Sequence, residues 1–355
     1  MGEIRKVLIV GGSWHGGNCT GLARGFRALG HAVELVAHDH HIPAVDRTLT
    51  ARVMHRVLTP MFVRRFNTEI IRAAKQFEAD LVVLFKGAFV AAETVIALRQ
   101  MGPWLANFYP DNTLFHSTLD IAIFRHFDHI FTTKRFGIRD IGTHVGTTNV
   151  SFLPHAYDPQ VHRPFTDHRV LKSWVCDVSF TGTWSPRKEA LLTALRRELM
   201  PGQLRIWGGQ WERCRSSELR DAIMGHVACG DQFAMAISAS NVNLGLLSER
   251  RHGASDDDQI TSRTFHIPAC GGFMLHQRTA EVAEYFEEGT EVGCFSTTAE
   301  LREKVMYYLS HEEERVRMAR AGYERCLAGN SWMDRAEAIL DKYDEARGTR
   351  YATLV

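Results

Sequence analysis

The stretch Lys6-Val7-Leu8-Ile9-Val10-Gly11-Gly12 decides the fold class of this 355-residue chain. Its apolar run is typical of a strand that is buried on both faces, and the glycines after it allow a tight turn. A helical pattern follows, with Leu22, Phe26 and Leu29 on one face. A second apolar run, Ala32 to Ala37, completes a strand–helix–strand unit, which predicts a parallel sheet covered by helices.

The same alternation of strands and helices continues in two series along the chain. Further strands are predicted at 80–85, 104–108 and 129–132, then at 177–181, 204–207, 242–246, 273–275 and 292–295. Helices are predicted at 64–77, 91–100, 186–199, 262–269, 281–287, 299–309, 311–327 and 332–345. Between the two series, His155 to Lys172 shows little periodicity, which places a domain boundary near residue 165.

We therefore expect an α/β fold with two Rossmann-like domains, 1–165 and 166–330. A C-terminal helix, 331–355, is expected to return toward the first domain. Ligands of open α/β sheets bind at the carboxyl ends of the strands. Two such edges facing each other would form a cleft between the domains.

Composition excludes several functional classes. The chain is 45% hydrophobic and its formal net charge is +1, so no global field favours nucleic acid. Seven scattered cysteines without a CxxC pair argue against a disulfide framework and a structural zinc site. The start lacks a signal-peptide core, and no apolar run is long enough for an integral membrane segment. These features predict a cytoplasmic protein that binds a small molecule.

The glycine loop from Gly11 to Gly17 is the first candidate site. Its backbone N–H groups, including those near Gly12, could bind an anion at a helix N-terminus. His15 lies in the middle of this loop and is expected to point into the cleft. The dinucleotide fingerprint is broken because Ser13 stands where a glycine is required, so NAD binding with Asp39 as the ribose ligand is disfavoured. A tight turn that only lets the helix pack on the sheet is the alternative.

Two acidic or histidine clusters could suggest a metal, but we predict none. The run His38 to His41 has no second cluster at ligand spacing to complete a site. The run Asp256 to Asp258 precedes a predicted helix, where N-capping and solvation explain carboxylates equally well.

The predicted second domain contains a denser group of candidates. Gly182 and Thr183 follow a strand, and Arg187 and Lys188 lie in the first turn of the next helix. Because the helix dipole disfavours cations there, a bound anion such as a diphosphate would remove the conflict. Gly208, after the strand 204–207, is assigned to the same site.

A second group of candidates lies around residue 265. Arg263 and His266 are one helical turn apart on a short helix. The helix ends at Gly271-Gly272, whose backbone can approach a ligand closely. Together with Arg187-Lys188, this segment looks like half of a nucleotide-phosphate site.

These residues also carry a family resemblance. Arg263–Gly272, Tyr285–Gly289, Tyr307–Leu309 and Ala321–Arg325 closely resemble the C-terminal domain of CgeB-like glycosyltransferases, which belong to the GT-B class. The resemblance is specific over about 175–330. It is generic over 1–165, where the opening and the segment 152–158 look like GT-B proteins.

The resemblance implies a sugar transferase with a nucleotide-diphosphate sugar donor (a UDP-, GDP- or dTDP-sugar) in the C-terminal domain. The acceptor, a small molecule, a glycan or a protein, would bind the N-terminal domain, and no metal or other cofactor is required. Many retaining members carry two glutamates separated by seven residues. Asp258 and His266 match these positions. The histidine departs from the glutamate that usually holds the ribose hydroxyls, which predicts weakened donor binding.

The resemblance also implies a mechanism. Arg187, Lys188, Arg263 and the N–H groups near Gly271-Gly272 would stabilise the leaving diphosphate. A retaining route, which the resemblance weakly favours, needs no protein base. An inverting route would use His15 or Asp111. A nucleotide-sugar epimerase and a nucleotide-sugar binding protein without catalysis are the alternatives, and the oligomeric state is left open.

Overall fold

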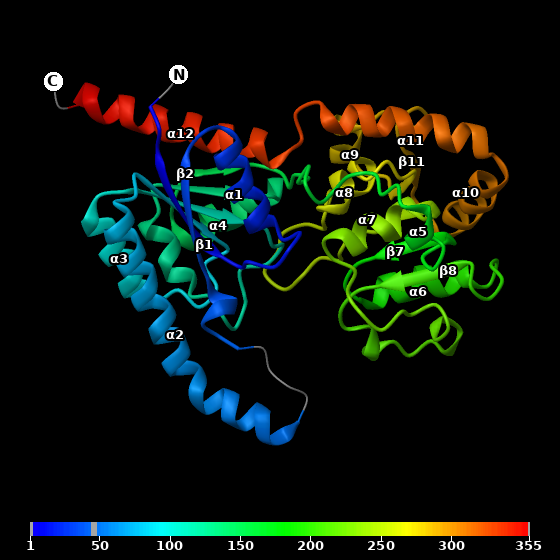
Figure 1. Cartoon of the computed structure of the whole chain (residues 1–355), viewed down its shortest axis with the longest axis horizontal. Helices are drawn as coiled ribbons and strands as arrows, with labels where there is room; N and C mark the ends of the chain where they lie inside the picture. The colour runs from blue at the N-terminus through cyan, green and yellow to red at the C-terminus, as the bar shows by residue number, and fades with distance from the viewer. Residues whose placement is uncertain (1–2, 44–47, 354–355) are drawn as a thin grey trace. The chain divides into compact units, whose positions relative to one another are not determined.

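The computed structural model describes residues 3–43 and 48–353, and these form two compact units (Figure 1). The first unit comprises 1–155, 250–256 and 332–355, and the second comprises 156–249 and 257–331. The chain therefore passes between units at 155/156, whereas the sequence pattern placed the boundary near 165. It also returns briefly to the first unit at 250–256 and again for its C-terminal helix.

The first unit contains a six-stranded sheet in which every pairing is parallel, in the order β2-β1-β3-β4-β5-β6. Its strands are β1 (Lys6–Gly11), β2 (Ala32–Ala37), β3 (Leu81–Phe85), β4 (Trp104–Tyr109), β5 (His129–Thr132) and β6 (Val150–Phe152). Its helices are α1 (Asn18–Ala28), α2 (Leu49–Phe77), α3 (Ala92–Met101), α4 (Arg135–Val145) and α12 (Trp332–Thr353).

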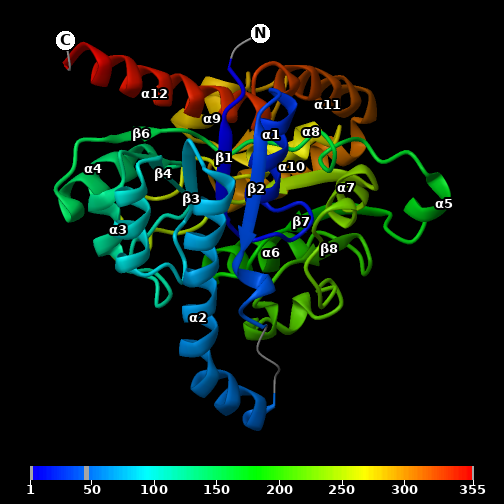
Figure 2. The same ribbon diagram turned by 60° about the vertical axis from the view of Figure 1, so that its left-hand side comes forward.

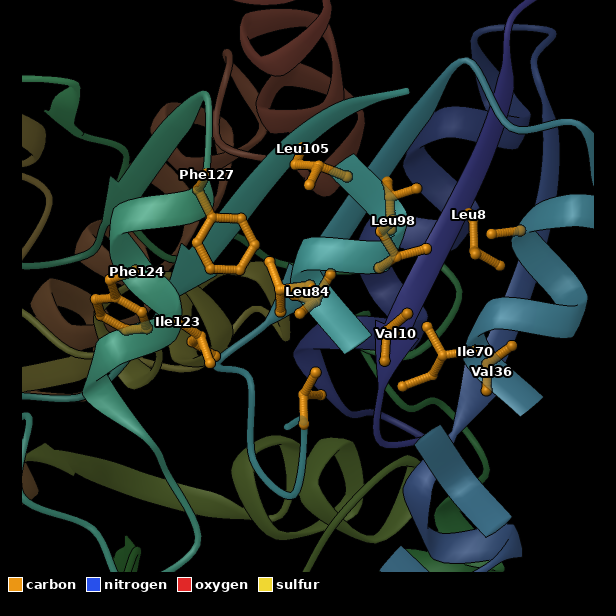
Figure 3. Packing of buried hydrophobic residues seen from close by; sticks show 14 of the residues in the cluster. Leu8, Val10, Val36, Ile70, Leu84, Leu98, Leu105, Ile123, Phe124 and Phe127 are labelled. Carbon is orange, nitrogen blue, oxygen red and sulfur yellow. The ribbon is translucent and has the colours of Figure 1, made fainter. Parts of the chain in front are cut away.

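The core of this unit forms because its central strands are apolar on both faces. Every residue of β4 is buried, as are Leu8 and Val10 of β1. Figure 3 shows Leu8 and Val10 near Ile70 of α2, with Leu84 of β3 in the same cluster. Such two-sided burial is expected where helices cover both faces of a parallel sheet.

The C-terminal helix α12 packs on α1 through two glycines. A Cβ atom at Gly21 would lie 2.3 Å from the Trp332 ring, and one at Gly25 would lie 2.2 Å from the Trp332 carbonyl oxygen. Trp332 is buried, so the close approach of the two helices depends on the missing side chains.

The second unit contains a five-stranded, parallel sheet in the order β11-β10-β9-β7-β8. Its strands are β7 (Cys176–Thr181), β8 (Leu204–Trp207), β9 (Ser240–Gly245), β10 (Met274–Gln277) and β11 (Gly293–Phe295). Its helices are α5 (His168–Leu171), α6 (Pro186–Arg196), α7 (Asp231–Ser238), α8 (Arg263–Ala269), α9 (Ala280–Tyr285), α10 (Thr298–Ser310) and α11 (Glu312–Leu327). None of the helices among the described residues is both long and apolar enough to span a bilayer.

The α/β class with two parallel sheets is confirmed, with differences in individual helices. The helix predicted at 64–77 begins at Leu49. Helices α4, α5 and α7 and strand β6 were not predicted. Gly137 and Gly142 lower the helix propensity of α4, and α7 has only eight residues, too few for a clear periodic pattern.

Strand order creates one reversal point in each sheet. In the first unit the chain runs from β1 outward to β2 and then back across to β3, so the reversal lies between β1 and β3. In the second unit it lies between β7 and β9. Loops leaving the carboxyl ends of these strands diverge there, which opens room for a ligand.

We expect Gly25→Ala to destabilise the protein by about 1–3 kcal/mol, because the added methyl group would overlap the Trp332 backbone. Gly348→Ala in α12 is the matched control, since a Cβ atom there would meet nothing within 4 Å. That substitution should leave stability unchanged or raise it by less than about 1 kcal/mol. Denaturant unfolding of both variants measures the difference, and equal stabilities would contradict the proposed packing of α1 on α12.

Candidate functional site

Arg263 lies at the reversal point of the second sheet. It begins α8, and its Nη2 donates a hydrogen bond of 2.7 Å to the carbonyl oxygen of Leu246, directly after β9. Its guanidinium carbon lies 5.5 Å from the ring centre of Phe180 in β7. Burial lowers the pKa of Arg263 to about 10, although the charge of Asp258 raises it, so the group is a cation at neutral pH. Nε is buried, and no described residue accepts its hydrogen.

Two glycines leave space beside this guanidinium. A Cβ atom at Gly182, after β7, would lie 3.0 Å from Arg263 Nη1. Gly208, after β8, has φ of +153°, and a Cβ atom there would lie 1.9 Å from the Gly182 carbonyl oxygen. Any side chain at either position would therefore crowd the carboxyl edge of the sheet next to Arg263.

Lys188 brings a second cation to this edge. It is buried in the first turn of α6, and its Nζ lies 3.3 Å from the carbonyl oxygen of Thr183 and 3.3 Å from Ser248 Oγ. The structure thus brings Gly182, Thr183 and Lys188 together along the loop that follows β7.

Arg187 does not join this group. A bound anion was predicted at the N-terminus of α6, but groups of the protein itself occupy that helix end. The backbone N–H of Arg187 donates to Glu249 Oε1 at 2.7 Å, and Ser185 caps the helix by accepting from the Lys188 N–H. The Arg187 side chain is exposed and lies 3.7 Å from Asp257 Oδ2. The helix dipole that was expected to attract a diphosphate is therefore already compensated by the carboxylate of Glu249.

The expectation for Gly271 and Gly272 is also wrong. Their N–H groups donate to the carbonyl oxygens of Pro268 and Ile267 at the end of α8, so they are not available to a diphosphate. Gly271 has φ of +73°, as a helix-terminating residue requires, and a Cβ atom at Gly272 would lie 2.3 Å from Ile237. Both glycines allow the chain to turn from the end of α8 into β10.

His266 is buried, and its side chain contacts other residues of the second unit. Its Nε2 lies 3.0 Å from the carbonyl oxygen of Ala156, and its ring stacks on that of His162 with centroids 3.6 Å apart. Burial lowers the pKa of His266 to about 3, so the ring is neutral and Nε2 donates. One ring nitrogen, Nδ1, is left as an acceptor for a ligand.

Asp258 is buried and close enough to Arg263 to act on its pKa. Together with Asp256 and Asp257 it forms the acidic run for which a metal was considered. Among the residues that the structure describes, no group of three or more His, Cys, Asp or Glu side chains is arranged to hold a metal ion.

In the first unit, the glycine loop after β1 is occupied by the protein's own groups. The N–H of Ser13 donates to Asp39 Oδ1 at 2.9 Å, and its hydroxyl donates to Asp39 Oδ2 at 2.7 Å. Although burial acts to raise it, these hydrogen bonds lower the pKa of Asp39. A Cβ atom at Gly12 would lie 1.9 Å from the Trp14 ring, so this glycine makes room for an indole. His15 is exposed and makes no side-chain hydrogen bond with a described residue.

Asp111 belongs to a charged cluster after β3 and β4. Its Oδ2 lies 2.6 Å from Lys86 Nζ and 3.1 Å from His116 Nε2. Burial acts to raise the pKa of Asp111, but the hydrogen bond with His116 and the charge of Lys86 bring it well below the ordinary value. A carboxylate with so low a pKa is a weak general base, but it can keep the His116 imidazole in a fixed orientation. Lys86 has φ of +68°, a strained conformation that is concentrated at functional sites.

The sequence pattern did not predict a site role for Glu249, Lys86 or His116. Lys86 carries a readable signal, since a lone cation directly follows a buried strand and precedes a glycine. Glu249 and His116 show no such signal in the sequence, because each acts through a contact with a residue that is distant in the chain or lies in an irregular loop.

Comparisons with known proteins show what this chain is similar to. Residues 187–341 match a protein-family model described as glycosyl transferase-like. No curated protein sequence matches the chain. Among solved structures, sucrose-phosphate synthase from Thermosynechococcus elongatus superposes with a TM-score of 0.65 at 15% identity, over 97% of this chain and 100% of that one.

Two further solved structures are informative. HepE of Anabaena, in complex with UDP-glucose, has a TM-score of 0.63 at 12% identity, over 96% of this chain and 100% of that one. A putative UDP-N-acetylglucosamine 2-epimerase from Listeria monocytogenes has a TM-score of 0.54 at 11% identity, over 98% of both chains. At these identities the likeness establishes the fold, which is that of GT-B glycosyltransferases.

We expect His266→Glu to destabilise the protein rather than to restore a ribose ligand. The new carboxylate would be buried opposite the Ala156 carbonyl oxygen, where only its protonated form can donate. His266→Gln keeps an N–H donor and does not titrate. Burial should raise the folded-state pKa of the glutamate, against the opposing charge of Arg263. The stability that the protonated glutamate contributes is then fully present below the unfolded pKa of about 4.3 and is lost as pH rises.

The free energy of unfolding of the two variants, measured between pH 5 and 7.5, should therefore diverge. The glutamate variant should lose up to about 1.4 kcal/mol per pH unit relative to the glutamine variant. A gap that stays constant over this range would show that the glutamate is already ionised in the folded protein, which would contradict this expectation.

Proposed function

We propose that this protein, whose residues 187–341 match a glycosyl transferase-like family, is a glycosyltransferase that uses a nucleotide-diphosphate sugar. The observation that carries the proposal is the guanidinium of Arg263. It lies at the reversal point of the second sheet, beside two obligate glycines, with a buried donor that no described residue satisfies. A buried N–H of a guanidinium without an acceptor is costly, and a phosphate oxygen would accept its hydrogen.

The donor is proposed to bind the second unit at the carboxyl ends of β7 and β9. Arg263 would hold the diphosphate, and Lys188 would add a second positive charge next to Thr183. Gly182 and Gly208 would let the diphosphate approach the backbone. The positive charges stabilise the leaving diphosphate, so we propose that transfer proceeds without a divalent cation.

UDP is the proposed nucleotide, because HepE, a structural neighbour, was solved with UDP-glucose. His266 can contribute one acceptor, Nδ1, to the ribose. A glutamate would offer two acceptor oxygens, so we expect weaker donor binding than a CgeB-like enzyme with that glutamate would show.

The acceptor is proposed to bind the first unit near the cluster formed by Lys86, Asp111 and His116. Asp111 is proposed to orient His116 rather than to remove a proton itself, because its pKa is low. The retaining route, in which the leaving phosphate takes the acceptor proton, is the proposed stereochemistry.

A nucleotide-sugar epimerase is the second candidate, favoured by the superposition on the Listeria protein. The products distinguish the two: an epimerase returns an isomerised nucleotide sugar, and a transferase releases UDP. Binding of UDP without either product would identify a nucleotide-sugar binding protein.

UDP should raise the melting temperature of the wild-type protein, and Arg263→Gln should abolish most of this shift. Loss of a charge-assisted hydrogen bond of about 1.5–3 kcal/mol corresponds to roughly a 10- to 150-fold weaker affinity. Arg197→Gln, directly after the C-terminal end of α6, is the matched control, since that side chain is exposed and pairs with Glu218. A full UDP shift in Arg263→Gln, with unchanged stability without ligand, would overturn the donor site.

Hydrolysis of UDP-glucose tests the stereochemistry without a known acceptor. A retaining enzyme transfers glucose to water with its anomeric configuration kept, so α-glucose should appear first. Proton NMR recorded before mutarotation measures the anomer, and EDTA in a parallel sample should not slow UDP release. Initial formation of β-glucose would contradict the retaining route and make His116 and His15 the candidate bases.

A further inference from the structure

Helix α2 buries side chains along only part of its length. Phe66, Ile70, Ala73 and Ala74 in its C-terminal half are buried against the first sheet. None of the side chains from 53 to 65 is buried. Figures 1 and 2 show this N-terminal half extending away from the strands of its own unit.

The extending half carries an exposed apolar stripe. Val53, Met54, Val57 and Met61 are between 41 and 71% exposed. Val53, Val57 and Met61 are four residues apart, so they lie on one face of the helix, and Met54 flanks them. Single exposed apolar side chains are ordinary, but a continuous stripe on a surface helix marks an interaction site.

The stripe is bordered by cations. Arg56, Arg64 and Arg65 are exposed and form no ion pair with any described residue. The sequence between Asp46 and Glu69 contains no acidic residue. This segment is therefore strongly basic, although the net charge of the whole chain is only +1.

We propose that the N-terminal half of α2 docks the protein on the surface of an anionic phospholipid bilayer. Apolar side chains of a surface helix insert at the level of the headgroups, and arginines beside them reach the lipid phosphates. A polybasic segment is attracted to anionic lipid within a Debye length. A second copy of the chain fits less well, because pairing two such helices would bring their arginines together without an acidic partner.

Vesicle sedimentation of the full-length chain tests this proposal. The wild type should bind vesicles of equal parts phosphatidylcholine and phosphatidylglycerol, and it should bind pure phosphatidylcholine far less. Raising the salt concentration should weaken binding, because it screens the arginines. The double variant Val57→Glu, Met61→Glu should bind the anionic vesicles at least about tenfold more weakly than the wild type does.

The matched control is the double variant Met306→Glu, Val316→Glu. These side chains are 45 and 58% exposed, on α10 and α11, so the control adds the same charge on other helices. It should bind as the wild type does, and both variants should melt at the wild-type temperature. Arg64→Gln with Arg65→Gln should reduce the preference for anionic lipid.

Three results would overturn the proposal. The first is a wild type that does not sediment with anionic vesicles. The second is equal binding by the α2 variant and the wild type. The third is a stable dimer in light scattering that Val57→Glu, Met61→Glu dissociates, which would assign the stripe to a second copy. None of these measurements uses a nucleotide, so they are independent of the donor site.

Discussion

The parallel arrangement of both sheets is the constraint on which the rest of the molecule depends. Central strands such as β4 are buried on both faces, so they have no room for polar side chains that a ligand could reach. Polar chemistry is therefore confined to the strand ends, and the strand order selects which ends diverge. Arg263 lies at such a reversal point, beside β7 and β9. The cluster of Lys86 and Asp111 also lies at strand ends, but after the neighbouring strands β3 and β4 and not at the reversal between β1 and β3.

Much of the anion-binding capacity near these ends is used by the protein's own carboxylates. Asp39 accepts from the glycine loop after β1, and Glu249 accepts at the N-terminus of α6. Such internal partners stabilise helix ends and turns that would otherwise leave donors unsatisfied. In Arg263, by contrast, the buried Nε–H has no acceptor among the described residues. The donor site is therefore proposed from two observations together: the unsatisfied N–H of Arg263 and its position at the reversal point of the second sheet.

His266 illustrates how packing limits a site residue. Its position in the sequence matches that of a ribose-binding glutamate in the resembling family, yet its ring is stacked on His162 and bonded to Ala156. Burial and the Ala156 carbonyl oxygen disfavour a charged carboxylate at this position, whereas the nearby charge of Arg263 favours one. The histidine is thus suited to its buried surroundings, and that burial restricts what it can offer a ligand.

The sequence alone predicts the α/β class, most strands and the position of Arg263 at the start of a short helix, because these depend on apolar runs, glycines and local periodicity. It also pointed to Gly182, Thr183 and Lys188, which follow one strand directly. Three contacts became visible only in the folded chain. Glu249 accepts from the helix end at Arg187, and the N–H groups of Gly271 and Gly272 donate to carbonyl oxygens of α8. Asp111 pairs with Lys86 and His116. Hydrogen bonds and ion pairs join residues far apart in the chain or within irregular loops, and local patterns contain no information about such partners.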